Sequence, residues 1–330
     1  MPLHPQVQAI RDQLERNPVP GLYTLPIEEA RAADVRSAIE TAGAVEPVAC
    51  VSDFLVPGPA GPLAARLYLP DEGAHSQPPG QQPPGQQPPG QQRKPPVLVY
   101  FFGGGWSLGT LDTSDAVCRR LTNLARCATV AMSYRLAPEN KFPAAVEDCY
   151  AGTAWVAVHA ADLGVDATRL AVGGDSSGGN LAAAVTLLAR ERGGPLLAHQ
   201  LLVYPNTDYA ADTDSMRDVT DELFFNPKSV AWYWGMYLSS PQDGANPLAS
   251  PLRADDLAGL PPATVITAEY DPLRDEAERY AARLSGAGVP TELIRYDGMT
   301  HGFFTALGTL DLARDAVATA ADRLSRAFAR

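Results

Sequence analysis

A serine lies at the centre of a glycine-flanked pentapeptide, Gly174-Asp175-Ser176-Ser177-Gly178, with the pattern G-x-S-x-G. The apolar run before it, residues 170–172, predicts a buried strand, and the alanine- and leucine-rich run after it, residues 181–190, predicts a helix. A serine on such a sharp turn exposes its hydroxyl beside the unpaired N–H groups of the helix N-terminus. Ser176 is therefore a candidate acyl-accepting nucleophile, although a capping serine in a glycine-rich turn has the same pattern.

A serine hydroxyl is a weak nucleophile and needs a general base, which is itself oriented by a carboxylate. Of the five histidines, only His301 lies in a glycine-flanked loop directly after the last predicted strand. The carboxylate should follow a strand between the serine and the histidine, because nucleophile, acid and histidine occur in that order in α/β-hydrolases. Asp271 is our choice, and Glu269 and Asp275 are alternatives. Asp271 precedes Pro272, and an aspartate before a proline is also typical of a turn without a catalytic role.

The negative charge that develops on a substrate carbonyl oxygen needs backbone N–H donors nearby. Three successive glycines, Gly103 to Gly105, follow the apolar strand predicted for residues 96–102. The residue after the nucleophile, Ser177, supplies a further N–H at the start of the predicted helix. The two segments together predict an oxyanion hole.

These residues require a scaffold in which several strands end at the same edge of one sheet. Strands and helices alternate along the chain, which is typical of an α/β protein with a mostly parallel, doubly wound sheet. The predicted strands cover residues 48–56, 63–69, 96–102, 128–133, 170–172, 201–204, 263–268 and 292–296. The predicted helices cover residues 6–15, 27–41, 115–125, 142–159, 181–190, 276–285 and 310–328.

Residues 1–47 carry only the first two helices, so we predict an N-terminal helical cap on a catalytic domain of residues 48–330. Pro-Pro-Gly-Gln-Gln occurs three times between Pro78 and Gln92 and has no apolar residue to bury, which predicts a disordered or polyproline II loop. The aromatic-rich insertion at residues 208–243 predicts a second cap segment over the site. We expect Trp106, Phe224 and Phe225 to line a substrate pocket.

The bulk composition excludes several kinds of partner. The formal net charge is −12 and the basic residues are scattered, which argues against nucleic acid and anionic membranes. The four cysteines form no pair with metal-ligand spacing and predict buried thiols in a reducing compartment (Cys50, Cys118, Cys127 and Cys149). The first sixteen residues lack the apolar core of a secretory signal, and no run is long enough to span a bilayer. We therefore expect a cytoplasmic protein.

Five segments in this order resemble bacterial members of the hormone-sensitive-lipase family of α/β-hydrolases. The segments are Gly103-Gly104-Gly105-Trp106, Tyr134-Arg135-Leu136-Ala137-Pro138-Glu139, Gly174-Asp175-Ser176-Ser177-Gly178-Gly179, Asp271-Pro272-Leu273-Arg274-Asp275 and His301-Gly302-Phe303.

The resemblance implies an α/β-hydrolase fold with a helical cap and a serine carboxylesterase that acts on short- to medium-chain acyl esters, a small-molecule substrate, without a metal or organic cofactor. It implies a catalytic triad of Ser176, Asp271 and His301. It also implies an oxyanion hole made by the N–H groups of Gly104, Gly105 and Ser177. Family members often dimerise through the edge of the last strand, here residues 292–296.

The chain departs from the family motif at Phe102, where the family has a histidine whose ring holds the glycine loop. A phenylalanine cannot donate those hydrogen bonds, so packing must hold the loop. A smaller departure is Ser177, where alanine is usual. Two alternatives stay open: a deacylase or lyase-type tailoring enzyme of secondary metabolism on the same fold, favoured by Phe102, and a non-catalytic small-molecule receptor, disfavoured by the presence of His301.

Overall fold

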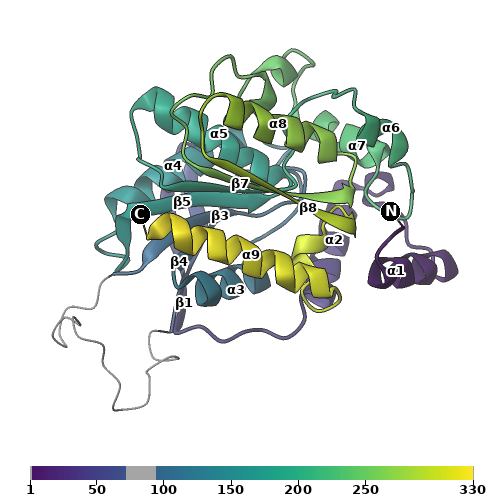
Figure 1. Cartoon of the computed structure of the whole chain (residues 1–330), viewed down its shortest axis with the longest axis horizontal. Helices are drawn as coiled ribbons and strands as arrows, with labels where there is room; N and C mark the ends of the chain where they lie inside the picture. Colours follow the sequence, from purple (N-terminus) through teal and green to yellow (C-terminus); the bar gives the residue numbers. More distant parts are fainter. Residues whose placement is uncertain (1, 72–93, 330) are drawn as a thin grey trace.

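A single sheet of eight strands forms the centre of the computed structural model, which describes residues 2–71 and 94–329 (Figure 1). The strand order is β1-β2-β4-β3-β5-β6-β7-β8. Only the pairs β1–β2 and β2–β4 are antiparallel, and the strands from β4 to β8 run parallel. The strands are β1 (Cys50–Gly58), β2 (Gly61–Leu69), β3 (Pro96–Phe101), β4 (Ala128–Met132), β5 (Asp166–Asp175), β6 (His199–Val203), β7 (Ala263–Tyr270) and β8 (Thr291–Thr300). The predicted repeat loop at residues 78–92 lies outside the described residues.

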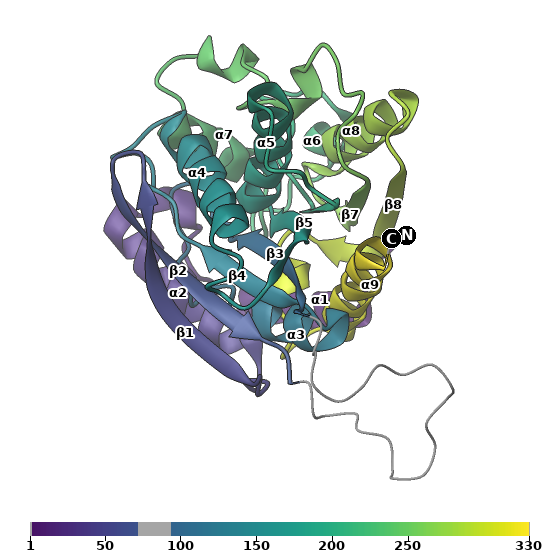
Figure 2. The ribbon, with the colours of Figure 1, turned by 90° about the vertical axis from the view of Figure 1, so that its left-hand side faces the viewer.

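Helices cover both faces of this sheet, as the continuous apolar strands predict. Figure 2 shows α4, α5 and α8 on one side and α3 and α9 on the other. Along β3 the side chains alternate between the two hydrophobic cores: Val97 and Val99 pack with α4 and α5, and Leu98 and Tyr100 pack with α3 and α9. The covering helices are α3 (Asp115–Ala125), α4 (Ala144–Val158), α5 (Ser177–Arg192), α8 (Arg274–Gly286) and α9 (Asp311–Phe328).

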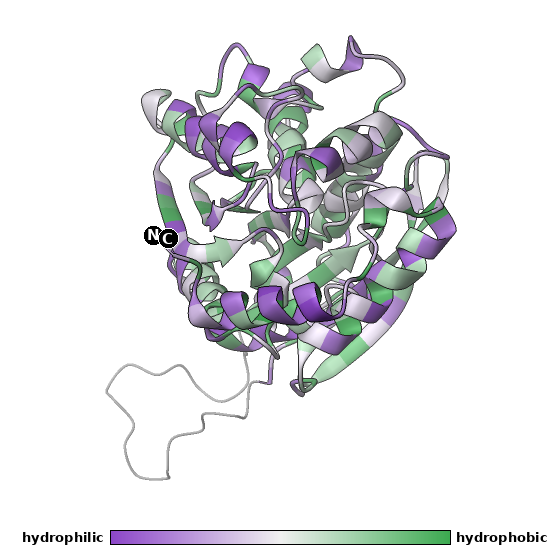
Figure 3. Ribbon diagram, turned by 90° about the vertical axis from the view of Figure 1, so that its right-hand side faces the viewer, coloured by the Kyte–Doolittle hydropathy of each residue, from purple (hydrophilic) through white to green (hydrophobic). Residues whose placement is uncertain are grey.

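The hydropathy of the ribbon follows this layered arrangement. Figure 3 shows hydrophobic residues along the inner strands and hydrophilic residues on the outward faces of the surrounding helices. In the part of the chain that the structure describes, no helix combines the length and the apolar character needed to cross a membrane.

The remaining helices come from the first 42 residues and from the aromatic-rich insertion. They are α1 (Pro5–Arg16), η1 (Leu22–Thr24), α2 (Ile27–Ala42), α6 (Asp214–Asp218) and α7 (Pro227–Tyr237), and the short turns η2 (Asp243–Ala245), η3 (Pro251–Arg253) and η4 (Phe303–Thr305) complete the order. The short η1 packs against both α2 and α7. The Nε of Arg11 in α1 donates to Asp221 in the insertion at 2.7 Å. The two segments, about 200 residues apart in sequence, are therefore in direct contact.

Two details differ from the sequence predictions. The helical spacing of Ala30 and Ile39 predicts that both face the core, but Ile39 is 61% exposed, whereas Ala30 is fully buried. The inward face of α2 is therefore turned away from Ile39. Cys50 lies at the exposed start of the edge strand β1, so the expectation of a buried thiol is wrong for this residue; the other three cysteines are buried, and all four are free.

Candidate active site

The turn between β5 and α5 holds Ser176 in a conformation that the flanking glycines permit. Ser176 has φ 55° and ψ −121°, which is strained for a residue with a Cβ. A Cβ on Gly174 would lie 2.4 Å from the carbonyl oxygen of Phe101, and one on Gly178 would lie 2.0 Å from the same atom. The turn passes so close to β3 that only glycine fits at both positions. The side chain of Ser176 stands at the carboxyl edge of the sheet and at the N-terminus of α5.

Ser176, His301 and Asp271 form a continuous chain of hydrogen bonds. The Nε2 of His301 lies 2.9 Å from Oγ of Ser176, and its Nδ1 lies 2.7 Å from Oδ2 of Asp271. Each residue directly follows a parallel strand, β5, β8 or β7, so the sheet brings together residues that are up to 125 positions apart. Asp271 is fully buried, and its Oδ1 accepts from the N–H of Leu273 at 2.8 Å. The carboxylate is thereby held in one orientation toward the imidazole.

The two alternative acids do not contact the imidazole. Glu269 accepts from the N–H of Gly298 at 2.7 Å, and Asp275 accepts from the N–H of Ser215 at 2.8 Å. Both carboxylates fix loops around the site. Asp271 is therefore the acid that the geometry favours.

The glycine loop after β3 turns its backbone toward Ser176. Gly104 and Gly105 have φ values of 107° and 57°, which suit glycine. Both line the cavity that contains Ser176 and His301. Among the described residues, the N–H groups of Gly104, Gly105 and Ser177 have no protein acceptor. The N–H of Ser177 belongs to the first turn of α5, although its side chain is buried and outside the cavity. These donors are free to bind an oxyanion.

Comparison with known proteins identifies the family. Residues 98–305 match a family model described as the alpha/beta hydrolase fold. The carboxylic ester hydrolase LipN of Mycobacterium tuberculosis is 43% identical over 259 residues, which are 77% of this chain and 64% of LipN. Esterase LipI of the same organism is 39% identical over 82% of this chain and 80% of LipI. An esterase structure from Pyrobaculum calidifontis has a TM-score of 0.86, with 39% identity over 98% of this chain and 99% of that one.

The chain belongs to the hormone-sensitive-lipase-like family of α/β-hydrolases. The predictions of the fold, the family and the carboxylic ester hydrolase class are confirmed. Neither the tailoring-enzyme alternative nor the receptor alternative is favoured, because these relatives are named esterases. The matched segment covers just under two thirds of the length of LipN.

Relative to its family, this chain holds the glycine loop without the motif's histidine. The ring of Phe102 stacks on Tyr134 at a centroid distance of 4.6 Å, and the Tyr134 hydroxyl donates to the Phe102 carbonyl at 2.9 Å. Asp175 accepts from the N–H of Gly103 at 3.2 Å and from the hydroxyl of Tyr100 at 2.8 Å. Packing, as predicted, therefore acts together with hydrogen bonds to the backbone.

Arg31, in helix α2, also holds this loop. Its Nε donates to the carbonyl of Ser107 at 3.0 Å, and one terminal nitrogen donates to the carbonyl of Ala137 at 3.0 Å. Its guanidinium also forms a two-point pair with Glu139 at 2.9 and 2.7 Å. Arg31 is not predictable from the sequence, because no local pattern links residue 31 to a loop 76 positions away.

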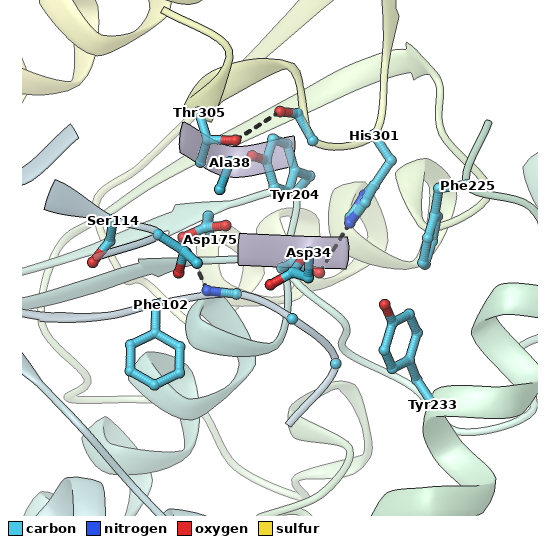
Figure 4. Close-up of a pocket in the computed structure, with 16 residues that line it drawn as sticks. Asp34, Ala38, Phe102, Ser114, Asp175, Tyr204, Phe225, Tyr233, His301 and Thr305 are labelled. Carbon is cyan, nitrogen blue, oxygen red and sulfur yellow. Dashed lines mark hydrogen bonds between the residues drawn. The ribbon is translucent and has the colours of Figure 1, made fainter. Parts of the chain in front are cut away.

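A cavity of about 160 Å³ lies between the glycine loop, helices α2 and α7, and His301 (Figure 4). Phe225 lines it and stacks on the imidazole of His301 at 4.1 Å, and Tyr204 contacts the imidazole at 4.6 Å. The two rings restrict how the imidazole can tilt. Tyr233 also lines the cavity, and its ring lies so close to Gly105 that a Cβ there would meet it at 1.9 Å.

Two of the predicted pocket residues lie elsewhere. Trp106 is fully buried behind the glycine loop, where it stacks on Tyr237 at 4.2 Å and its Nε1 donates to Asn180 at 3.3 Å. Phe224 packs against the core on the α3 and α9 side of the sheet. Neither lines the cavity. Both are large aromatic residues near the site, and the sequence does not reveal that the ring of Tyr237 covers Trp106 or that Phe224 packs against the core.

The site as described contains no arrangement for a metal. Within residues 2–71 and 94–329, no group of three or more His, Cys, Asp or Glu side chains is placed to hold a metal ion.

Proposed function

We propose that this chain hydrolyses short- to medium-chain acyl esters through an acyl-enzyme on Ser176. The observation that carries the proposal is the hydrogen-bonded chain from Asp271 through His301 to Ser176, beside backbone N–H groups that lack an acceptor. A nucleophile, a base, an orienting acid and an oxyanion hole are the parts that acyl transfer requires.

Each residue has a separate role in the proposed mechanism. His301 takes the proton of Ser176 as Oγ attacks the ester carbonyl carbon, and Asp271 stabilises the resulting imidazolium. The N–H groups of Gly104, Gly105 and Ser177 bind the oxyanion. His301 then gives its proton to the departing alcohol, and a water molecule, deprotonated by His301, hydrolyses the acyl-enzyme and restores Ser176.

The cap, the dimer and the cellular location belong to the same proposal. Contacts of η1 with α2 and α7 support one cap that residues 1–47 and 208–243 build over a catalytic domain of residues 48–330. A homodimer through β8 is supported by its position at the sheet edge and by Leu293, which is 43% exposed there. A cytoplasmic location rests on the sequence composition alone.

The direct test compares the wild type with Ser176→Ala on p-nitrophenyl acetate and p-nitrophenyl butyrate. We expect the variant to lose turnover by at least about 10⁴-fold, because the nucleophile is removed, while its circular dichroism spectrum and melting temperature stay close to those of the wild type. Ser177→Ala serves as the matched control, because only its N–H, which alanine retains, takes part in the mechanism. Turnover by Ser176→Ala at the wild-type rate would contradict the proposal.

A further inference from the structure

Asp34 is a charged residue on the inward side of the cap helix α2. It lies one turn after the buried Ala30 and one turn before Ala38, which lines the cavity. Figure 4 shows Asp34 in the same cavity as Tyr233 and His301. A face that packs onto the catalytic domain is normally apolar, so a carboxylate at this position needs an explanation.

The carboxylate of Asp34 has no cationic partner among the described residues. None of the residues that line the cavity is a lysine or an arginine. Arg31, three positions earlier on α2, is engaged with Glu139 and Glu28. The one favourable group near the Asp34 carboxylate is the backbone N–H of Gly109.

Asp175 provides the second carboxylate of the cavity, and both of its hydrogen bonds are to groups of the protein. Asp175 accepts from the hydroxyl of Tyr100 and from the N–H of Gly103, so it holds the glycine loop in place. Asp34 accepts a single hydrogen bond, from the backbone N–H of Gly109, and its carboxylate has no cationic partner among the described residues. It is therefore the carboxylate that is available to a bound molecule.

Asp34 carries a charge at neutral pH. Burial raises its pKa from 3.8 to about 6, and the nearby Asp175 contributes to the rise. At pH 7.5 the ionised form still dominates. Placing an unpaired charge in a partly buried site costs free energy, which a bound cation would offset.

We propose that Asp34 is a specificity-determining residue through which the cavity favours esters that carry an ammonium group over neutral esters of the same shape. This inference rests on the proposed ester hydrolysis and names the class of ester. The ammonium group would lie beside the Asp34 carboxylate, while the ester carbonyl lies between Ser176 and the glycine loop. Tyr233 presents an aromatic ring to the same cavity, which also suits a cation.

The cation can belong to the alcohol or to the acyl part of the ester, and two matched pairs distinguish these cases. Butyrylcholine and 3,3-dimethylbutyl butyrate differ only by a nitrogen or a carbon atom in the alcohol. The p-nitrophenyl esters of 4-trimethylammoniobutanoic acid and 5,5-dimethylhexanoic acid differ in the same way in the acyl chain. The measured quantity is the ratio of kcat/KM for the cationic ester to that for the neutral ester.

We expect a ratio of about ten or more at pH 7.5 in at least one pair, because a charge pair at a few ångströms in a partly buried site is worth roughly a factor of ten. Asp34→Asn, which keeps the shape of the side chain, should bring this ratio close to one. Glu29→Gln removes the same charge from an exposed position of α2 and should leave the ratio unchanged.

The wild-type protein alone provides a second measurement. The titratable groups that share the cavity with Asp34 are Asp175, Tyr204, Tyr233 and His301. His301 acts as the base on both esters of a pair, so its catalytic role is common to the two kcat/KM values. We expect the ratio to rise between pH 5 and pH 7.5, as Asp34 ionises with its pKa of about 6.

The inference is overturned if both ratios stay below two in the wild type, or if Asp34→Asn leaves a high ratio unchanged. It is also overturned if p-nitrophenyl butyrate is hydrolysed but none of the four probe esters is. If p-nitrophenyl butyrate is not hydrolysed either, the proposed function fails as well. The two failures are therefore distinguishable.

Discussion

Replacement of Arg31 by methionine should impair catalysis although Arg31 lies outside the cavity. Arg31 connects helix α2 to the loop that carries Gly104 and Gly105, through a hydrogen bond to the Ser107 carbonyl. Its guanidinium holds the carbonyls of Ser107 and Ala137 at 3.0 Å, and its side chain is only 23% exposed. Methionine keeps much of the aliphatic stem and removes all of these hydrogen bonds.

The contacts limit the size of this effect. A hydrogen bond to a charged group contributes about 1.5–3 kcal/mol, and partial exposure favours the lower value. Two such bonds to loop carbonyls correspond to about 3 kcal/mol. Since about 1.4 kcal/mol is a tenfold change in rate, the largest loss in kcat is about 10²-fold. We expect kcat to fall by roughly 10- to 100-fold and KM to change by less than about threefold. In the proposed mechanism the loop binds the oxyanion of the transition state more tightly than the carbonyl oxygen of the bound substrate.

Steady-state hydrolysis of p-nitrophenyl butyrate and thermal unfolding should be measured together. Arg11→Met is the matched control, because Arg11 pairs with Asp221 and Glu15 in the cap and does not touch the glycine loop. We expect this control to lose some thermal stability and to keep its kcat. If Arg31→Met keeps its kcat within twofold while its melting temperature falls as much as that of the control, Arg31 only stabilises the fold and the reasoning is refuted.

Three further predictions concern the groups around the site. Burial raises the pKa of Glu276 from 4.5 to about 8, so the native state retains its proton and stability falls as pH rises between these values, by about 5 kcal/mol at most. Urea unfolding from pH 5 to pH 9 should show a smaller fall for Glu276→Gln, and equal falls would contradict this. Gly178→Ala should yield little soluble protein, because its Cβ would lie 2.0 Å from the Phe101 carbonyl oxygen; a wild-type melting temperature would refute the close approach. Tyr134→Phe leaves the Phe102 carbonyl without its donor and should cost about 1–2 kcal/mol of stability by urea unfolding, with a reduced kcat; unchanged values would show that packing alone holds the loop.

The sequence predicts the scaffold well because its signals are local. The alternation of apolar runs with glycine and proline places the strands to within a few residues, although β5 begins at Asp166, four residues before the predicted apolar core. The polar residues at its start carry no apolar signal. Ser176, His301 and Asp271 are predictable because motif and chain order fix the edge of the sheet to which each belongs.

The parts of the site that the sequence does not predict depend on contacts between distant segments. Arg31 reaches a loop 76 residues away, and no pattern around residue 31 indicates this. Asp34 has a weak signal, since it lies four residues from Ala30 and from Ala38 on the inward face of an amphipathic helix. Trp106 lies beside the glycines of the loop, but the stacked ring of Tyr237 covers it, and no local pattern indicates this contact.

The central claim is that Ser176 is the residue that receives the acyl group. Incubation with a fluorophosphonate probe, followed by intact-mass spectrometry and peptide mapping, tests it most directly, because such probes react with an activated serine. The account predicts a single adduct on the peptide that contains Ser176, and no adduct on Ser176→Ala. An adduct on another residue, or equal labelling of the variant, would contradict it.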